Sequence, residues 1–228
     1  MENIALKSVG ITKYFHDPVT TQVLNKVSME VRKGEFVSIV GKSGCGKSTL
    51  LYVLSTMDRD YEGELHINGV KVTGLSLNTL ARIRNSSIGF VFQFHYLLPD
   101  FTSLKNVMIP ALRLGKYSPK EIEERAYDKL KLFGVEDQAL KKVSKLSGGQ
   151  QQRVAIARSL INDPAIIMCD EPTGNLDSKN TGIVFDLFQQ LSKTYGQTLI
   201  VVTHDEDFAR RSDRIIEMAD GVVKDHGY

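Results

Sequence analysis

The sequence predicts an α/β fold, in which a core built on a parallel β-sheet carries an antiparallel β-subdomain and an inserted α-helical subdomain. Three observations predict it. The first ninety or so residues show strand patterns, the middle of the chain turns helical, and the last third alternates strand and helix. The 228 residues suffice for one domain of this kind. We therefore expect a single domain over residues 1–228, with the helical subdomain inserted at about residues 95–160.

Two kinds of strand are predicted in the first ninety residues. From Val27 to Val31, and again from Leu65 to Ile67, apolar and polar residues alternate as in half-buried strands. Phe36–Val40 is a continuous apolar run that ends at Gly41, which is typical of a strand buried on both faces. The alternating runs are therefore expected to be half-buried strands, and the continuous run a strand of the core sheet.

The residues after the apolar strand form a phosphate-binding pattern. They read GKSGCGKS and satisfy G-x-x-x-x-G-K-[ST], the P-loop, between a predicted strand and a helix. The glycines let backbone N–H groups approach phosphate oxygens, and the helix aims its positive end at the same anion. The alternative is a glycine-rich turn with an incidental lysine. The expected nucleotide-binding residues are Gly41, Lys42, Ser43, Gly44, Cys45, Gly46, Lys47, Ser48 and Thr49.

Within this loop, two side chains have assigned chemistry. Lys47 can reach the β- and γ-phosphates, and the Ser48 hydroxyl can bind Mg²⁺. The sequence therefore predicts ATP or a similar nucleotide, with Mg²⁺, as the ligand.

The middle of the chain carries helix signals. Ser118–Glu121 forms a capping box with proline at the first helical position, and Gly134 supplies a stop. A second helix is expected from Gly148 to Ile161.

The last third predicts a parallel sheet with crossover helices. Strands are expected over Ala165–Cys169 and Thr198–Thr203, with a helix face over Ile183–Leu191 between them. The first of these strands ends in Asp170 and Glu171, at the sheet edge where α/β folds bind ligands. We expect Asp170 to hold the magnesium and Glu171 to polarise or deprotonate the attacking water.

A second anion-binding element precedes this acidic strand by about twenty residues. Leu146–Gln150 reads LSGGQ, which combines a serine hydroxyl, two glycines and a helix start. Read alone, it could be an ordinary serine cap with a glycine turn. The predicted binding residues are Ser147, Gly148, Gly149 and Gln150.

Together these motifs resemble the ATPase domain of ABC proteins, over essentially the whole chain. The resemblance implies hydrolysis of ATP to ADP and phosphate with Mg²⁺. It implies that Gln93 contacts Mg²⁺ and joins core to helical subdomain, that Asp177 signals across a dimer, and that His204 contacts the γ-phosphate. The implied catalytic residues are Glu171, His204, Lys47 and Gln93, and the implied metal ligands are Ser48, Gln93 and Asp170.

The resemblance also implies an aromatic side chain stacked on adenine, for which two candidates exist. Phe15 fits the spacing within Gly10–Phe15, whereas Tyr14 fits the distance to Leu24. In the family, the Ser147 end of one subunit caps the ATP held by the other, which predicts a homodimer on ATP binding. Cys45 stands where the family usually has serine, and we expect little effect because the backbone does most of the binding.

The stretch after Gln93 indicates which machine the ATPase serves. Gln93–Thr102 reads QFHYLLPDFT and resembles the ATPases of bacterial lipoprotein-releasing (Lol) systems. ATPases of macrolide exporters and a cell-division regulator that transmits force without transport share much of this pattern. Soluble ABC ATPases of DNA repair or translation fit less well, because only about fifty residues separate Gln93 from Leu146, without heptads. We expect a permease to dock near residues 93–110, where the alternative for the apolar side chains is ordinary core.

Composition is consistent with a peripheral subunit on the cytoplasmic face of the bacterial inner membrane. Lys and Arg number 29 against 27 Asp and Glu, so the formal charge of +2 demands no nucleic acid. The apolar runs fall far short of the roughly 18 residues that a membrane helix needs, so no direct membrane insertion and no signal peptide are expected. Two cysteines, Cys45 and Cys169, suggest no disulfide framework.

Overall fold

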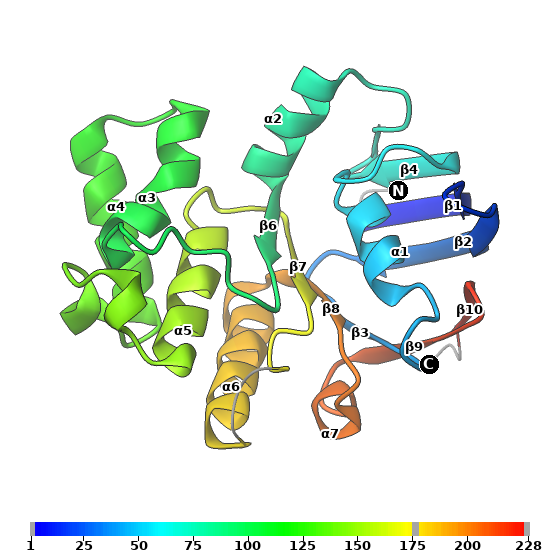
Figure 1. Cartoon of the computed structure of the whole chain (residues 1–228). Coiled ribbons are helices and arrows are strands. Elements are labelled where there is room, and N and C mark those ends of the chain that lie inside the picture. The colour runs from blue at the N-terminus through cyan, green and yellow to red at the C-terminus, as the bar shows by residue number, and fades with distance from the viewer. Residues whose placement is uncertain (1–2, 175–177, 226–228) are drawn as a thin grey trace.

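The computed structural model describes residues 3–174 and 178–225 and contains a six-stranded sheet at its centre (Figure 1). Five strands run parallel, and the edge strand β10 pairs antiparallel with β9. The order β10-β9-β3-β8-β7-β6 places β8 between β3 and β7. The strands are β3 (Phe36–Val40), β6 (Ile88–Val91), β7 (Ile166–Asp170), β8 (Thr198–Val202), β9 (Arg214–Ala219) and β10 (Val222–Asp225).

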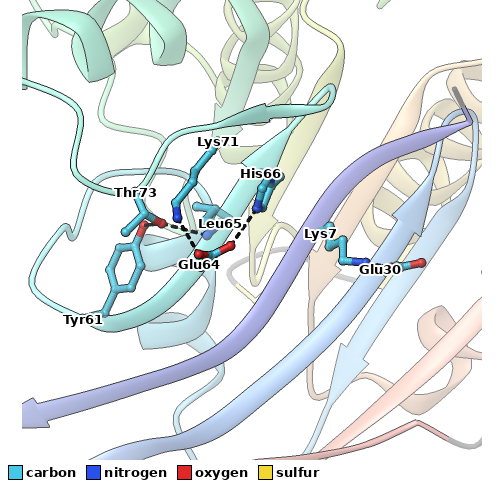
Figure 2. A network of polar contacts seen from close by, with 8 residues as sticks. All are labelled: Lys7, Glu30, Tyr61, Glu64, Leu65, His66, Lys71 and Thr73. Atoms are coloured by element: carbon cyan, nitrogen blue, oxygen red, sulfur yellow. Dashed lines mark hydrogen bonds and ion pairs between the residues drawn. The ribbon is translucent and has the colours of Figure 1, made fainter. Parts of the chain in front are cut away.

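A smaller antiparallel sheet has the order β2-β1-β4-β5. Its strands are β1 (Ile4–Phe15), β2 (Thr21–Arg32), β4 (Glu62–Ile67) and β5 (Val70–Lys71). Figure 2 shows charged pairs on this sheet. Lys7 Nζ of β1 lies 2.6 Å from Glu30 Oε1 of β2, and the Glu64 carboxylate contacts both His66 and Lys71. Opposite charges on neighbouring strands favour this pairing, although such exposed pairs add little stability.

The helices fall into two groups (Figure 1). Helices α1, α6 and α7 belong to the core, with α1 between the two sheets, and α2 leads into β6. Helices α3, α4 and α5 come from the part of the chain that follows β6 and precedes β7, and they form a separate cluster beside the sheet. Their bounds are α1 (Lys47–Leu54), α2 (Leu77–Ser87), α3 (Ser103–Leu114), α4 (Pro119–Leu132), α5 (Gly148–Ser159), α6 (Ser178–Tyr195) and α7 (Glu206–Ala209), with 3₁₀ turns η1 (Glu136–Gln138) and η2 (Val143–Lys145).

Alternate residues of the central strands enter two different cores. Ile166 and Met168 of β7 pack with α1 and the antiparallel sheet, whereas Ile167 and Cys169 pack with the helices of the other face. Both faces are therefore buried, which explains why these strands are continuous apolar runs in the sequence.

Several elements differ from what the sequence pattern predicts. The structure contains helices α2 and α3 and the β9–β10 hairpin, none of which is predicted from the sequence. Helix α2 buries Leu80 alone and so has no clean apolar period. Helix α3 buries Leu104, Val107 and Ala111 at helical spacing, but it contains Pro110, a residue that usually ends a helix. The helix expected to run to Ile161 ends at Ser159. No helix of the described residues combines the length and apolarity needed to cross a membrane.

Candidate functional site

The site forms where β3, β7 and β8 end at one edge of the central sheet. Val202 of β8 lies opposite both Ile39 of β3 and Asp170 of β7. Because these strands are parallel, the residues that follow them emerge side by side. The P-loop follows β3, Glu171 follows β7 and His204 comes shortly after β8, so the fold brings together groups far apart in sequence.

The P-loop between β3 and α1 requires glycine at two close approaches. A Cβ on Gly41 would lie 2.2 Å from the carbonyl oxygen of Met218. Gly46 has φ +102°, and a Cβ there would lie 2.9 Å from the carbonyl oxygen of Val23. Gly46 also precedes α1 without a side-chain cap, so the first N–H groups of α1 remain available to an anion.

Lys47 folds back onto the loop that precedes it. Its Nζ donates to the carbonyl oxygens of Gly41 and Lys42 at 2.8 and 3.0 Å, and its side chain is buried. A buried ammonium at the loop is a strong attraction for phosphate oxygens, which can replace the two carbonyls as its acceptors.

Two expected metal ligands meet directly in the structure. The Ser48 hydroxyl donates to Asp170 Oδ1 at 2.9 Å. Burial raises the pKa of the Asp170 carboxyl, the charge of Glu171 acts in the same direction, and hydrogen bonds from Ser48 and Tyr52 oppose the rise. Tyr52 of α1 was not predicted as a site residue, since an aromatic one helical turn beyond Ser48 reads as core.

This pair fits Mg²⁺ held together with a nucleotide. A desolvated carboxylate beside a hydroxyl offers the oxygen donors that Mg²⁺ prefers, and a cation there would offset the burial of Asp170. Within residues 3–174 and 178–225, no three His, Cys, Asp or Glu side chains are grouped to hold a metal ion by themselves. Since Mg²⁺ commonly keeps waters and phosphate ligands, one carboxylate is sufficient.

Glu171 is fixed at both its backbone and its side chain. Its N–H donates to the carbonyl oxygen of Val202 at 2.9 Å, and its φ of +47° is uncommon for a residue with a side chain. Its Oε2 lies 2.8 Å from His204 Nδ1 and accepts from the His204 N–H at 3.2 Å. The Glu171 carboxylate is thus held at the end of the sheet where the P-loop lies, and the more exposed His204 imidazole contacts it.

Gln93 lies near the same edge. It follows β6, and a Cβ on Gly174 would lie 3.0 Å from its Nε2. The side chain therefore reaches the segment just after Glu171. The structure gives no ligand contact for it, so its role at the metal stays a prediction.

The two adenine candidates lie on different faces of β1. Phe15 shares a face with Lys13, whose Nζ lies 5.1 Å from the Phe15 ring centroid, and Lys13 is paired across the strands with Leu24 beside the P-loop. The Phe15 ring is 46% exposed. Tyr14 points to the opposite face and stacks on His16 with ring centroids 6.3 Å apart.

The LSGGQ residues form the start of α5. The Ser147 hydroxyl accepts from the Gln150 N–H at 3.4 Å, and Gln150 Oε1 accepts from the Ser147 N–H at 3.0 Å, so the motif forms a capping box, and its binding of an anion stays a prediction. Gly148 has open space around it, whereas a Cβ on Gly149 would lie 2.4 Å from Asn180 Oδ1. In Figure 1, α5, which Ser147 caps, and α1, which follows the P-loop, lie on opposite sides of the central strands. Asp177 lies outside the described residues.

The segment between β6 and α3, residues 92–102, exposes apolar side chains. Phe94 and Tyr96 are 65% and 62% exposed, and Leu98 and Phe101 are 46% and 42% exposed. Its backbone is nevertheless ordered by the buried Asn106, which accepts from the Leu98 N–H at 2.8 Å and donates to the carbonyl oxygens of Leu98 and Thr102. We call these residues the β6–α3 segment.

The protein family described as "ABC transporter" matches residues 24–174. The "Lipoprotein-releasing system ATP-binding protein LolD" of Bacteroides thetaiotaomicron is 49% identical over 96% of this chain and 99% of its own length. "LolD 1" of Chlorobium chlorochromatii is 47% identical over 98% of this chain and 92% of its own length.

Solved structures agree with this match. The dimeric structure of MJ0796, a bacterial ABC transporter cassette, superimposes with a TM-score of 0.89 at 41% identity and covers 98% of this chain and 100% of that one. A second structure of MJ0796, a dimeric post-hydrolysis state bound to ADP and Pi, gives the same values. CbiO1 of Clostridium perfringens, part of an ABC transporter complex, gives 0.88 at 30% identity and covers 98% and 88%.

Proposed function

This chain belongs to the ABC transporter family and is one of its ATPases, and on that premise we propose that it powers the release of lipoproteins from a bacterial inner membrane. The observation that carries the proposal is the near full-length identity of 47–49% to relatives named for lipoprotein release. ATPases of exporters or cell-division regulators would share the motor and differ in the partner.

The proposed catalytic step is attack of water on the γ-phosphate of ATP. Glu171, oriented by His204, accepts the proton of the attacking water. Lys47 and the N–H groups at the start of α1 hold the phosphates, and His204 contacts the γ-phosphate. Mg²⁺, held by Ser48 and Asp170 with Gln93 nearby, supplies positive charge that offsets the charge of the transferred group. The products are ADP and phosphate.

The proposed working form is a homodimer that closes on ATP. Helix α5 and the helix after the P-loop, α1, lie on opposite sides of the central strands, and the start of α5 exposes a hydroxyl and N–H groups suited to an anion. MJ0796, at 41% identity, is a dimer in both of its structures. In the proposed dimer, Ser147, Gly148, Gly149 and Gln150 of each subunit cap the ATP of the other, and Asp177 signals between them.

Adenine is proposed to stack on Phe15 rather than Tyr14. The Phe15 ring is exposed and lies on the strand face that continues toward the P-loop, whereas Tyr14 is engaged with His16 on the other face. Lys13 behind the Phe15 ring adds a cation–π contact that fixes the ring.

The β6–α3 segment is the proposed docking site of a membrane permease at the cytoplasmic face of the inner membrane. Four exposed apolar side chains on an ordered backbone form the kind of patch that an amphipathic helix covers. No nucleic acid is proposed as a partner, and the chain itself is proposed not to insert into the membrane.

The test is capture of partners from detergent-solubilised membranes by tagged Glu171→Gln protein with ATP and Mg²⁺, using Lys47→Ala as the matched control. We expect integral membrane proteins together with bound lipoprotein on the first bait and little on the second. Capture of drug-efflux or division proteins instead would overturn lipoprotein release, and absence of any membrane chain would overturn the docking proposal.

A further inference from the structure

Helix α5 contacts the β6–α3 segment through one side chain with two donors. The guanidinium of Arg158 donates to the carbonyl oxygen of Tyr96 through Nη1 and to that of His95 through Nη2, both at 2.7 Å. His95 and Tyr96 have φ values of +58° and +44°, which residues with side chains rarely adopt. The forked donors of arginine match two adjacent carbonyls that this backbone turn points the same way.

A guanidinium in this position is not explained by stability alone. Burial lowers the pKa of Arg158 to about 10. No ion pair to Arg158 occurs among the described part of the chain, so the charge is balanced only by carbonyl dipoles. Since an apolar side chain would avoid this desolvation, the arginine is better explained by the shape that it gives to residues 95 and 96.

Gln151 connects the same segment to the other end of α5. It lies seven residues before Arg158 and therefore on the same helix face. Its Nε2 donates to the carbonyl oxygens of Val143 and of Leu146, the residue before Ser147, at 3.1 Å. Its side chain lies close enough to His95 to raise the pKa of that imidazole against the lowering effect of burial. One face of α5 thus holds both the ATP-capping end and the β6–α3 segment.

We propose that Arg158 is a positioning residue that fixes the β6–α3 segment to α5, the helix whose other end begins at Ser147, so that the partner surface and the ATP cap move as one body. The proposal rests on the proposed function for the two ligands, which are ATP at Ser147 and a membrane permease on the β6–α3 segment. The consequence is that closure of the dimer at Ser147 alters the segment, and a partner seated on the segment alters the position of Ser147.

The experiment compares Arg158→Met with its parent in the Glu171→Gln background, which retains ATP. Hydrogen exchange of the amides in residues 93–101 is measured with and without ATP and Mg²⁺, and dimer fraction is measured by light scattering. Arg158→Lys keeps the charge with a single ammonium. Arg125→Met is the matched control. Arg125 lies on α4, another helix of the cluster, and its guanidinium also donates to a loop carbonyl oxygen, that of Ile161.

In Arg158→Met we expect about tenfold faster exchange of the segment without ATP and loss of the ATP-induced change. ATP-dependent dimerisation should stay within about twofold, and Arg158→Lys should recover part of the protection. Wild-type exchange and a wild-type ATP response in Arg158→Met would overturn the proposal, as would an equal effect of Arg125→Met. Failure to capture a membrane partner would overturn the proposed function and leave this result standing, because exchange is read on the isolated protein.

Discussion

Nδ1 of His204 lies 2.8 Å from Oε2 of Glu171, and the same oxygen accepts from the His204 backbone N–H at 3.2 Å. The imidazole is 70% exposed, whereas the carboxylate is 15% exposed. Two donors from one residue therefore fix the carboxylate at the sheet edge beside the P-loop. This relationship supports the proposal that the carboxylate is the base and that the histidine orients it.

Replacing Glu171 by glutamine should lower ATP hydrolysis by about 10²- to 10⁴-fold, the usual contribution of a general base. The amide keeps the size of the side chain but cannot accept the proton of water. Phosphate release and equilibrium ATP binding are the two measurements. Binding should be retained, and a variant that keeps more than a tenth of the parental hydrolysis would remove Glu171 from the base role.

The adenine proposal separates two neighbouring aromatics. Phe15→Ala should raise the half-saturating ATP concentration about tenfold, which corresponds to ~1.4 kcal/mol of stacking. Tyr14→Ala should change it less than about threefold, because Tyr14 stacks on His16 instead. Titration of both variants with ATP decides between the residues, and the reverse order would assign the adenine to Tyr14.

Leu98→Glu places a charge on the exposed surface of the β6–α3 segment. Its backbone bonds to Asn106 do not involve the side chain, so thermal stability and basal ATPase should stay close to parental values. Capture of membrane partners should fall at least about tenfold, because a charge must then be desolvated in an apolar contact. Leu112→Glu, at an equally exposed leucine of α3, is the control, and equal losses in both would contradict a specific docking surface.

Asp163 gives a prediction for pH. Burial alone would raise the pKa of its carboxyl, but bonds from Lys129 and Arg125 outweigh burial and lower it. A lowered pKa in the folded state means that this ion-pair stability is present above the unfolded pKa and is lost as pH falls through the folded pKa. Asp163→Asn should therefore cost up to about 1 kcal/mol at neutral pH, with the small size set by solvent screening of an exposed pair, and this cost should disappear once pH falls below the folded pKa.

Asparagine suits this comparison because Asp163 has φ +48°, which asparagine also tolerates. Urea unfolding at several pH values measures the difference. A cost that persists at acid pH would show that packing rather than charge is lost.

Local patterns predicted the parts of the fold in which one residue type dominates a short stretch. The strands before the P-loop and before Glu171 consist almost entirely of apolar residues, so their burial can be predicted from composition. The capping box at Ser118 marks where its helix begins. Helix α2 was not predicted, because only Leu80 of its residues is buried and no apolar face results. Its N-cap, Ser76, does accept a hydrogen bond from the Thr79 N–H.

The site was predictable where a motif is contiguous, as in the P-loop, and not where partners meet across the fold. Arg158 and Tyr96 are 62 positions apart, and nothing near Arg158 distinguishes it from a solvated helix arginine. The bond from Tyr52 to Asp170 likewise depends on how α1 packs beside β7. Such contacts arise from tertiary packing, which one sequence does not display.

Capping of the ATP of one subunit by Ser147 of the other is tested by a second change, Ser147→Glu, in the Glu171→Gln protein. Light scattering and ATP binding are measured for the single and the double variant. We expect an ATP-dependent dimer for the single variant, and for the double variant a monomer that still binds ATP within about threefold, because like charges would meet across the interface. A double variant that dimerises normally, or that loses ATP binding as a monomer, would contradict capping by the partner.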